Sequence, residues 1–187
     1  SVLLTIDNPT TILMCLLLIL VGFGYKISMV PFHYWTPDVY EGSPTAVTAF
    51  LSVAPKAAGF ALFLRFFSSI FTTGGNFNSI SPILNIDWPM LLAVLSAVTM
   101  TVGNILALRQ ENVKRMLAYS TISHVGFMLM AACTLTTLAT SGILFYLLVY
   151  SFMNLSAFYM VIYMSNKYQA ELIDDWKGIG FKNPVLG

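Results

Sequence analysis

The stretch that decides the fold is MLAYSTISHVGFMLMAACTLTTLATSGILFYLLVYSFMNLSAFYMVIYMSN, residues 116–166. These 51 residues lie between Arg115 and Lys167 and contain no Lys, Arg, Asp or Glu. A helix needs about 20 apolar residues to cross the hydrocarbon layer of a membrane. The stretch is therefore too long for one spanning helix and suits two, with the small and polar residues 134–142 predicted as the turn between them.

Three further apolar windows precede this stretch. The first covers residues 11–30 and follows Pro9, a residue that suits a helix entrance. The second runs from position 45 to about position 67, and the third covers 88–108, with Trp88 as an interfacial anchor. The pattern predicts an all-α, polytopic transmembrane protein with about five spanning helices.

The composition agrees with a membrane protein and excludes other classes. Hydrophobic residues make up 57% of the 187 positions and charged residues 9%, whereas a soluble domain has about 25% charged residues. The formal net charge of +1 gives no basis for nucleic-acid binding through a broad basic face. The 14 Phe, nine Tyr and three Trp exclude disorder.

The basic residues separate by side if the chain crosses the membrane five times. One face receives only Arg65, and the opposite face also receives the acidic loop of Asp38 and Glu41. The basic residues of that opposite face are Arg109, Lys114, Arg115, Lys167, Lys177 and Lys182. Such an excess marks the cytoplasmic side, or the matrix or stroma of an organelle. Four or six helices would divide these residues more evenly, so the separation supports five.

Lys26 and Lys56 fit neither face. At 1.5 Å per residue, Lys26 lies about 24 Å along the first helix and Lys56 about 18 Å past Pro44, inside a layer about 30 Å thick. A charge there costs at least about 2.5 kcal/mol, so such residues are usually functional. The alternative is a stem that snorkels to the interface, which is easier for Lys26, close to Pro31, than for Lys56.

Both lysines adjoin a proline, Pro31 after Lys26 and Pro55 before Lys56. Proline within a span frees a backbone carbonyl, which is tolerated where a neighbouring helix or a water-filled cavity satisfies it. The pattern predicts a polar cavity at mid-depth. Burial and a nearby cation both disfavour a charged lysine there, so that it can exchange protons.

His124 is a third ionisable group near the midplane, about 16 Å into its predicted helix. An imidazole can accept a proton on one nitrogen and release it from the other, which suits a shuttle between lysines. The hydroxyl groups near it, predicted to order water, belong to Tyr119, Ser120, Thr121 and Ser123. The alternative is a neutral histidine with a structural hydrogen bond. His33, two residues past Pro31, is a secondary candidate at a helix break or in a loop.

Sequence motifs for bound cofactors are absent. The chain has no GxGxxG, P-loop, Cys cluster or His pair at haem-like spacing. Cys15 and Cys133 are single thiols in apolar surroundings, where packing is the expected role. We therefore expect no cofactor and no metal in this chain, which should move charge without holding electrons.

Three motifs resemble a known family. GYKISMVPFHYWTPDVYEGSPT at residues 24–45 is similar to the signature of the antiporter-like membrane subunits of respiratory complex I, the NADH-quinone oxidoreductase. TAFLSVAPKAAG at 48–59 resembles the branch called subunit N, or subunit 2 in mitochondria. NVKRMLAYSTISHVG at 112–126 is similar to the family's next hallmark. The resemblance covers most of the chain.

The resemblance implies a fold of about fourteen helices with two inverted five-helix repeats, each containing one broken helix. The chain then forms a single transmembrane domain fragment, residues 1–187. The end of the first repeat lies at about 10–67 and the start of the second at about 88–187. Lys26 matches the lysine at the first helix break, near Pro31, and Lys56 the central lysine on the next helix. The glutamate partner of the first lysine is expected upstream of Ser1, and the ionisable residue of the second broken helix beyond Gly187.

The resemblance also implies a function. It predicts a proton-translocating subunit in which Lys26, Lys56 and His124 form part of a midplane relay, while NADH, flavin, iron–sulfur clusters and quinone bind to other subunits. The expected partners are other membrane-arm subunits, including neighbouring antiporter-like subunits, and the lipid bilayer, with no nucleic acid. The preferred location is the bacterial cytoplasmic membrane, with the mitochondrial inner membrane or the thylakoid as alternatives.

Three other functions remain as alternatives. The first is a subunit of a multi-subunit sodium/proton antiporter. The same resemblance implies that such subunits have the same ancestry and the same lysines. The second is a scaffold that braces the membrane arm without transport. The third is an ordinary solute carrier, which would need substrate-recognition groups that the sequence does not offer.

Overall fold

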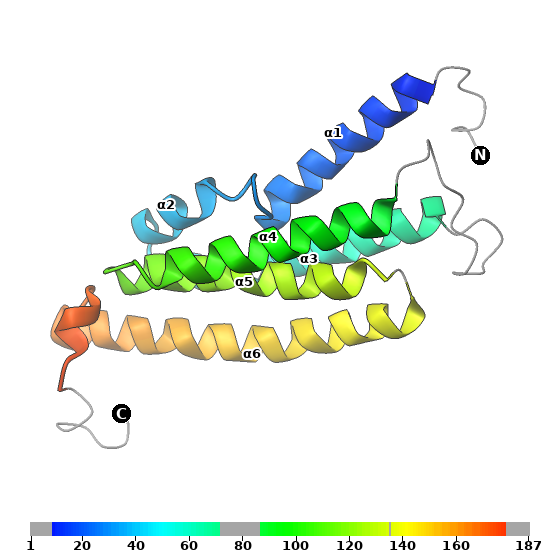
Figure 1. Ribbon diagram of the computed structural model, residues 1–187. Coiled ribbons are helices and arrows are strands. Elements are labelled where there is room, and N and C mark those ends of the chain that lie inside the picture. Colours follow the sequence, from blue (N-terminus) through cyan, green and yellow to red (C-terminus); the bar gives the residue numbers. More distant parts are fainter. Residues whose placement is uncertain (1–8, 72–86, 135, 179–187) are drawn as a thin grey trace.

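A computed structural model describes residues 9–71, 87–134 and 136–178 of the chain (Figure 1). The helices are α1 (Pro9–Ile27), α2 (Trp35–Gly42), α3 (Thr45–Phe71), α4 (Trp88–Ala107), α5 (Val113–Ala132), α6 (Thr137–Tyr168) and the short 3-10 helix η3 (Ile173–Trp176). No strand is assigned within these ranges. The all-α prediction is confirmed.

Helices α3 to α6 lie side by side in a bundle, and α1 and α2 follow one another along its side (Figure 1). Three helices, α3, α4 and α6, are long and apolar enough by themselves to cross a membrane. Helix α5 has 20 residues but carries Lys114, Arg115 and several hydroxyl groups. Helix α1 has 19 residues and is apolar, and it ends at the break before α2. The five predicted spans are thus α3, α4, α5, α6 and the broken pair α1–α2.

The break between α1 and α2 begins earlier than the sequence suggested. The first helix was predicted to continue at least to Val30, but it ends at Ile27 because Ser28 has a left-handed backbone, with φ of 67°. The Val30 amide donates to the Thr99 hydroxyl of α4 at 3.2 Å. The neighbouring helix therefore satisfies a backbone group that the break leaves free, as expected for irregular backbone at membrane depth.

Helices α4 and α5 approach closely because each presents a glycine to the other. A Cβ at Gly103 would lie 2.6 Å from the Ser123 amide nitrogen, and one at Gly126 would lie 2.7 Å from the Met100 amide nitrogen. Both distances are too short for any side chain. Small residues at such positions allow membrane helices to pack backbone against backbone.

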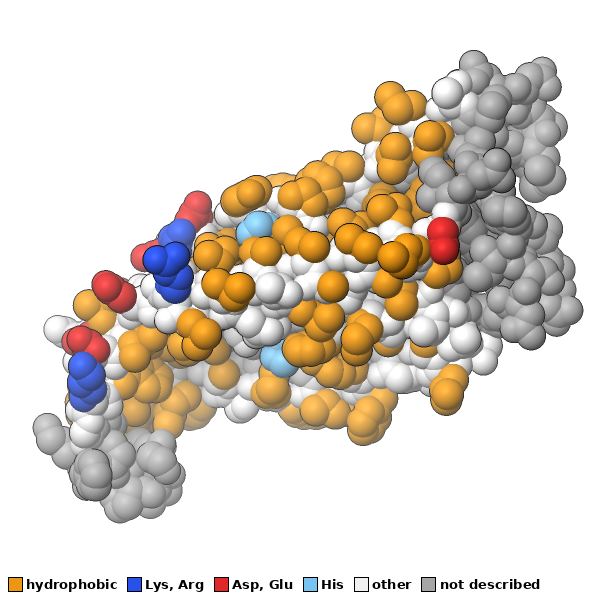
Figure 2. Space-filling view, in the orientation of Figure 1, with side chains coloured by type: hydrophobic (Ala, Val, Ile, Leu, Met, Phe, Trp, Pro, Cys, Tyr) orange, Lys and Arg blue, Asp and Glu red, His pale blue; other side chains and the backbone are white. Residues whose placement is uncertain are grey.

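Charged side chains gather at one end of the bundle (Figure 2). The carboxyl ends of α4 and α6, the amino end of α5 and the helix η3 meet there, whereas Arg65 lies towards the other end of α3 (Figure 1). This arrangement agrees with the predicted separation of the basic residues between the two ends of the bundle. Lys182, which was part of that prediction, lies outside the described residues.

The connection between α5 and α6 is shorter than predicted. Residues 134–142 were expected to form the turn, but α6 already begins at Thr137. The preceding Thr136 caps the helix, since its hydroxyl accepts a hydrogen bond from the Ala139 amide at 3.1 Å. The small polar residues after Thr137 are therefore the first turns of the helix.

Candidate functional site

Lys56 lies inside the bundle on α3, one residue after Pro55. Its relative exposure is 1%, and its ammonium nitrogen has no hydrogen-bond partner among the described residues. The nitrogen sits 5.7 Å from the centre of the Tyr40 ring of α2. Thr48 and Ser52, at intervals of four residues before it, are also buried. This face of α3 therefore carries a row of buried polar groups that ends at a lysine.

His124 lies on α5 beside this row. Its Nδ1 is 2.6 Å from the Tyr146 hydroxyl of α6, and its ring centre is 5.3 Å from that of Tyr150. Tyr150 links His124 to the helix of Lys56, since its ring lies beside the imidazole and its hydroxyl bonds to the Ser52 carbonyl of α3. The structure thus brings together two of the three residues predicted for the relay.

Tyr150 connects α6 to the polar row of α3. Its hydroxyl donates to the Ser52 carbonyl at 3.4 Å and accepts from the Asn154 side-chain amide at 3.0 Å. Both residues of α6 are buried, with Tyr150 at 2% and Asn154 at 4% exposure. Polar groups of α2, α3, α5 and α6 thus form one cluster around Lys56. We call it the Lys56 cluster, and its members are Tyr40, Ser52, Lys56, His124, Tyr146, Tyr150 and Asn154.

Sequence reasoning missed the part of the Lys56 cluster that α2 and α6 supply. One signal was present, because Tyr146, Tyr150 and Asn154 follow one another at intervals of four in an apolar helix and must share one face. Tyr40 gave no such signal, since it lies in a helix of eight residues and its position beside Lys56 depends on how α2 packs.

Lys26 takes a different place from Lys56. It lies in the last turn of α1 and is exposed on the surface of the described residues. Its stem passes Gly59 of α3, where an added Cβ would lie 3.4 Å from Lys26 Cγ. Gly59 is close to one helical turn beyond Lys56. Lys26 therefore contacts α3 near the Lys56 cluster but is not part of it.

His33 and the predicted hydroxyl groups are arranged around other contacts. His33 is buried in the break, where its ring lies 4.4 Å from that of Tyr34. The Ser123 hydroxyl donates to the Asn104 side chain of α4 at 3.0 Å. Tyr119 and Ser120 are half-buried on α5. The hydroxyl bonded to His124 comes from Tyr146 of α6, and not from these neighbours on α5.

An ionic clamp at the charged end fixes α2 to α5. Arg115 pairs with Asp38 at 2.8 Å and with Glu41 at 2.7 Å. The Lys114 ammonium donates to the Glu41 carbonyl at 2.7 Å, at the carboxyl end of α2. The hydrogen bond that Arg115 donates to the Glu41 carboxylate raises the pKa of Arg115, desolvation lowers it by less, and the charges of Asp38 and Glu41 raise it further. Arg115 therefore stays charged and holds the end of α2 in place.

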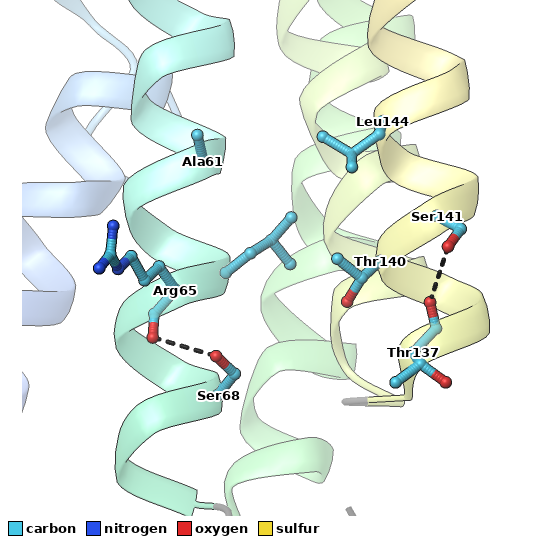
Figure 3. A pocket seen from close by; sticks show the side chains of 8 residues that line it. Ala61, Arg65, Ser68, Thr137, Thr140, Ser141 and Leu144 are labelled. Atoms are coloured by element: carbon cyan, nitrogen blue, oxygen red, sulfur yellow. Dashed lines mark hydrogen bonds between the residues drawn. The ribbon is translucent and has the colours of Figure 1, made fainter.

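A groove of about 500 Å³ lies at the opposite end, between α3 and α6 (Figure 3). Its apolar lining includes Ala61 and Leu144, and the Arg65 guanidinium points away from α6 (Figure 3). The Ser141 hydroxyl donates to the backbone of its own helix, at Thr137. Apolar and hydroxyl side chains thus line the groove together. Among the described residues there is also no group of three or more His, Cys, Asp or Glu side chains that could hold a metal.

Comparison with known proteins gives the family. Residues 2–187 match the family described as "NADH:quinone oxidoreductase/Mrp antiporter, TM". The match covers almost the whole chain. The chain belongs to this family of transmembrane proteins, as the three motifs had indicated, and it is an integral membrane protein.

Individual relatives agree. The chain is 49% identical over 178 residues to "NADH-quinone oxidoreductase subunit N 2" of Chloroherpeton thalassium, covering 95% of this chain and 34% of that protein. Respiratory complex I from Thermus thermophilus contains a chain with a TM-score of 0.66 and 36% identity, covering 89% of this chain and 34% of that one. An archaeal membrane-bound sulfane sulfur reductase contains a chain with a TM-score of 0.80 and 27% identity, and the match covers 96% of this chain and 35% of that one. The chain thus spans about a third of the length of its relatives.

Proposed function

We propose that the chain is a section of a proton-translocating membrane subunit of an NADH-quinone oxidoreductase. The names of its relatives support this, since the protein from Chloroherpeton thalassium and one that is 50% identical over 171 residues, from Chlorobium chlorochromatii, are both called subunit N of that enzyme. Electron transfer from NADH through flavin and iron–sulfur clusters to quinone then takes place on other subunits. This chain itself carries out no redox step.

The observation that carries the proposal is the burial of Lys56. Its ammonium lies over the Tyr40 ring, has no hydrogen-bond partner and is paired with no carboxylate among the described residues. A purely structural lysine would be expected to reach a carboxylate or the membrane interface. A lysine held in this way can gain and lose a proton without first breaking an ion pair.

In the proposed transfer, Lys56 and His124 are successive proton carriers. Lys56 releases its proton towards His124 when the charge nearby changes. The imidazole accepts it on one nitrogen and can release the proton from the other, so that charge moves from α3 to α5. The hydroxyl of Tyr146, 2.6 Å from His124 Nδ1, orients the ring, and it can relay a proton by accepting one from the imidazole while releasing its own to water. Lys26, beside Gly59, is the group from which we propose that Lys56 receives protons.

The same proposal assigns the surroundings of the chain. Other membrane-arm subunits, including neighbouring antiporter-like subunits, are its partners, and the bacterial cytoplasmic membrane is its location. We propose that one inverted repeat ends with residues of about 10–67 and that the next repeat begins with residues of about 88–187. The glutamate that pairs with Lys26 would be supplied by the rest of the subunit.

The test is the substitution Lys56→Met in the assembled complex. NADH-driven acidification of inverted membrane vesicles should fall at least about tenfold, because a positioned acid–base group typically contributes about 100-fold or more to a proton transfer. NADH oxidation by an artificial acceptor should be unchanged, because the electron carriers lie elsewhere. Methionine has a similar length and no charge, so it should fill the buried site without unfolding it.

Lys167→Met is the matched control, since Lys167 lies exposed at the end of α6 and bonds to Tyr163. It should leave acidification intact. Full pumping in a well-assembled Lys56→Met complex would contradict the proposal. A scaffold predicts that same result, whereas a sodium/proton antiporter subunit predicts that no NADH-dependent quinone reduction co-purifies with the chain.

A further inference from the structure

Tyr40 is the residue of α2 that reaches into the Lys56 cluster. It is fully buried, and the Lys56 ammonium nitrogen lies 5.7 Å from the centre of its ring. A cation within about 6 Å of an aromatic face is attracted by the negative potential of that face. The attraction is strongest where water is excluded, as it is at a lysine with 1% exposure.

The two carboxylates of α2 do not serve Lys56. Asp38 and Glu41 both pair with Arg115 at the charged end of the bundle. His124 of α5 repels the ammonium when it is protonated. Tyr150 of α6 bonds to the Ser52 carbonyl, on the same helix as Lys56. Among the described residues, the ring of Tyr40 is therefore the electronegative surface that faces the Lys56 ammonium.

We propose that Tyr40 is a positioning residue that stabilises protonated Lys56 through the face of its ring. This inference rests on the proposed function. A buried carboxylate at this place would bind the ammonium in an ion pair that is strong in a medium of low dielectric constant. The ring attracts the charged form more weakly. Lys56 can therefore hold a proton at this depth and still pass it on.

The surroundings of Tyr40 fix the ring in this place. The Thr48 hydroxyl of α3 donates to the Tyr40 carbonyl at 3.2 Å, and the Phe158 ring of α6 lies 6.1 Å away at an interplanar angle of 69°. The next residue, Glu41, is held by Lys114 and Arg115. The ionic clamp at the charged end is thus joined through one residue to the ring beside Lys56.

The experiment replaces Tyr40 with phenylalanine and with phenylalanines carrying one, two or three ring fluorines, introduced into the assembled complex by nonsense suppression. Fluorine withdraws charge from the ring face with little change in shape. NADH-driven acidification should be close to normal with phenylalanine, because the Tyr40 hydroxyl makes no hydrogen bond to a described residue. It should then fall stepwise, to about a tenth with three fluorines. Tyr40→Leu should fall as far.

Tyr159 supplies the matched control, since it is an exposed tyrosine of α6. The same series at Tyr159 should leave acidification unchanged. Equal pumping across the Tyr40 fluorine series would overturn the inference and assign the ring to packing alone. Lys56→Met is measured alongside: if it pumps normally, the proposed function fails as well, whereas if it is inactive and the Tyr40 series is flat, only the inference about Tyr40 fails. The fluorine series decides the question even if Tyr40→Leu does not assemble.

Discussion

Lys56 and Arg115 are basic residues of one small bundle, yet their surroundings are opposite. Arg115 has a side-chain exposure of 33% and two carboxylate partners, whereas Lys56 has 1% exposure and faces an aromatic ring. The carboxylates are placed where water already favours a charge, and among the described residues none is paired with the buried lysine. The charged end thus holds the bundle together through fixed charges, and we propose that the interior keeps a charge that can change.

The pKa of Arg115 supports its part of this comparison. The folded state raises the pKa of Arg115 above its ordinary value, chiefly because the guanidinium donates a hydrogen bond to the Glu41 carboxylate. A raised pKa gives a stabilisation that is complete below the unfolded value and is lost only as the pH rises through the folded one. The guanidinium therefore contributes throughout the physiological range, and its role is structural.

The largest effect in addition to that of Lys56 is expected from His124. Replacing it with Gln keeps a polar side chain near Tyr146 but removes the group that titrates. Acidification per NADH oxidised should fall at least about tenfold, since the lost acid–base group typically contributes about 100-fold or more to a proton transfer. His33→Gln is the matched control and should have a much smaller effect, because His33 lies in the break against Tyr34. Equal losses of acidification in the two variants would contradict a special role for the histidine of the Lys56 cluster.

A smaller effect is expected from the ionic clamp. Arg115→Gln removes both pairs with Asp38 and Glu41 and should lower the stability by about 1 kcal/mol, because the pairs are partly exposed. Acidification should fall a few-fold, since α2 carries Tyr40. The thermal unfolding midpoint of the purified complex and its pumping rate are the two measurements. Arg115→Lys should lose less of both, and pumping that falls with no change in unfolding would show that the clamp acts by another route.

The smallest effect is expected from the pair of Lys177 and Asp174. The two side chains are 2.8 Å apart but are exposed by 75% and 78%. Exposed pairs of this kind contribute at most about 1 kcal/mol and often nothing measurable. Lys177→Gln should therefore leave the unfolding midpoint and the pumping rate unchanged within measurement error. A loss as large as that of Arg115→Gln would mean that the position of an ion pair in the bundle matters more than its exposure.

The surroundings of these charged residues could be predicted from the sequence only in part. Counting residues predicted the same mid-depth position for Lys56 and Lys26, because the rise per residue of a helix is constant. The count could not predict that Lys56 is buried within the bundle while Lys26, in the last turn of α1, is exposed on the surface of the described residues. The partners of His124 were also missed. Its bond to Tyr146 joins α5 to a residue 22 positions later, and no local pattern specifies such a contact.

The sequence by itself determined the class of protein, the approximate bounds of its helices, the family, and the end of the bundle at which most charges gather. These follow from apolar length, from the rarity of charge and from motifs, which are all properties of consecutive residues. Only the tertiary structure decided that Tyr40 faces Lys56 and that Asp38 and Glu41 do not. Which group meets a buried charge depends on the way helices far apart in the chain pack together, and that packing sets the local electrostatics.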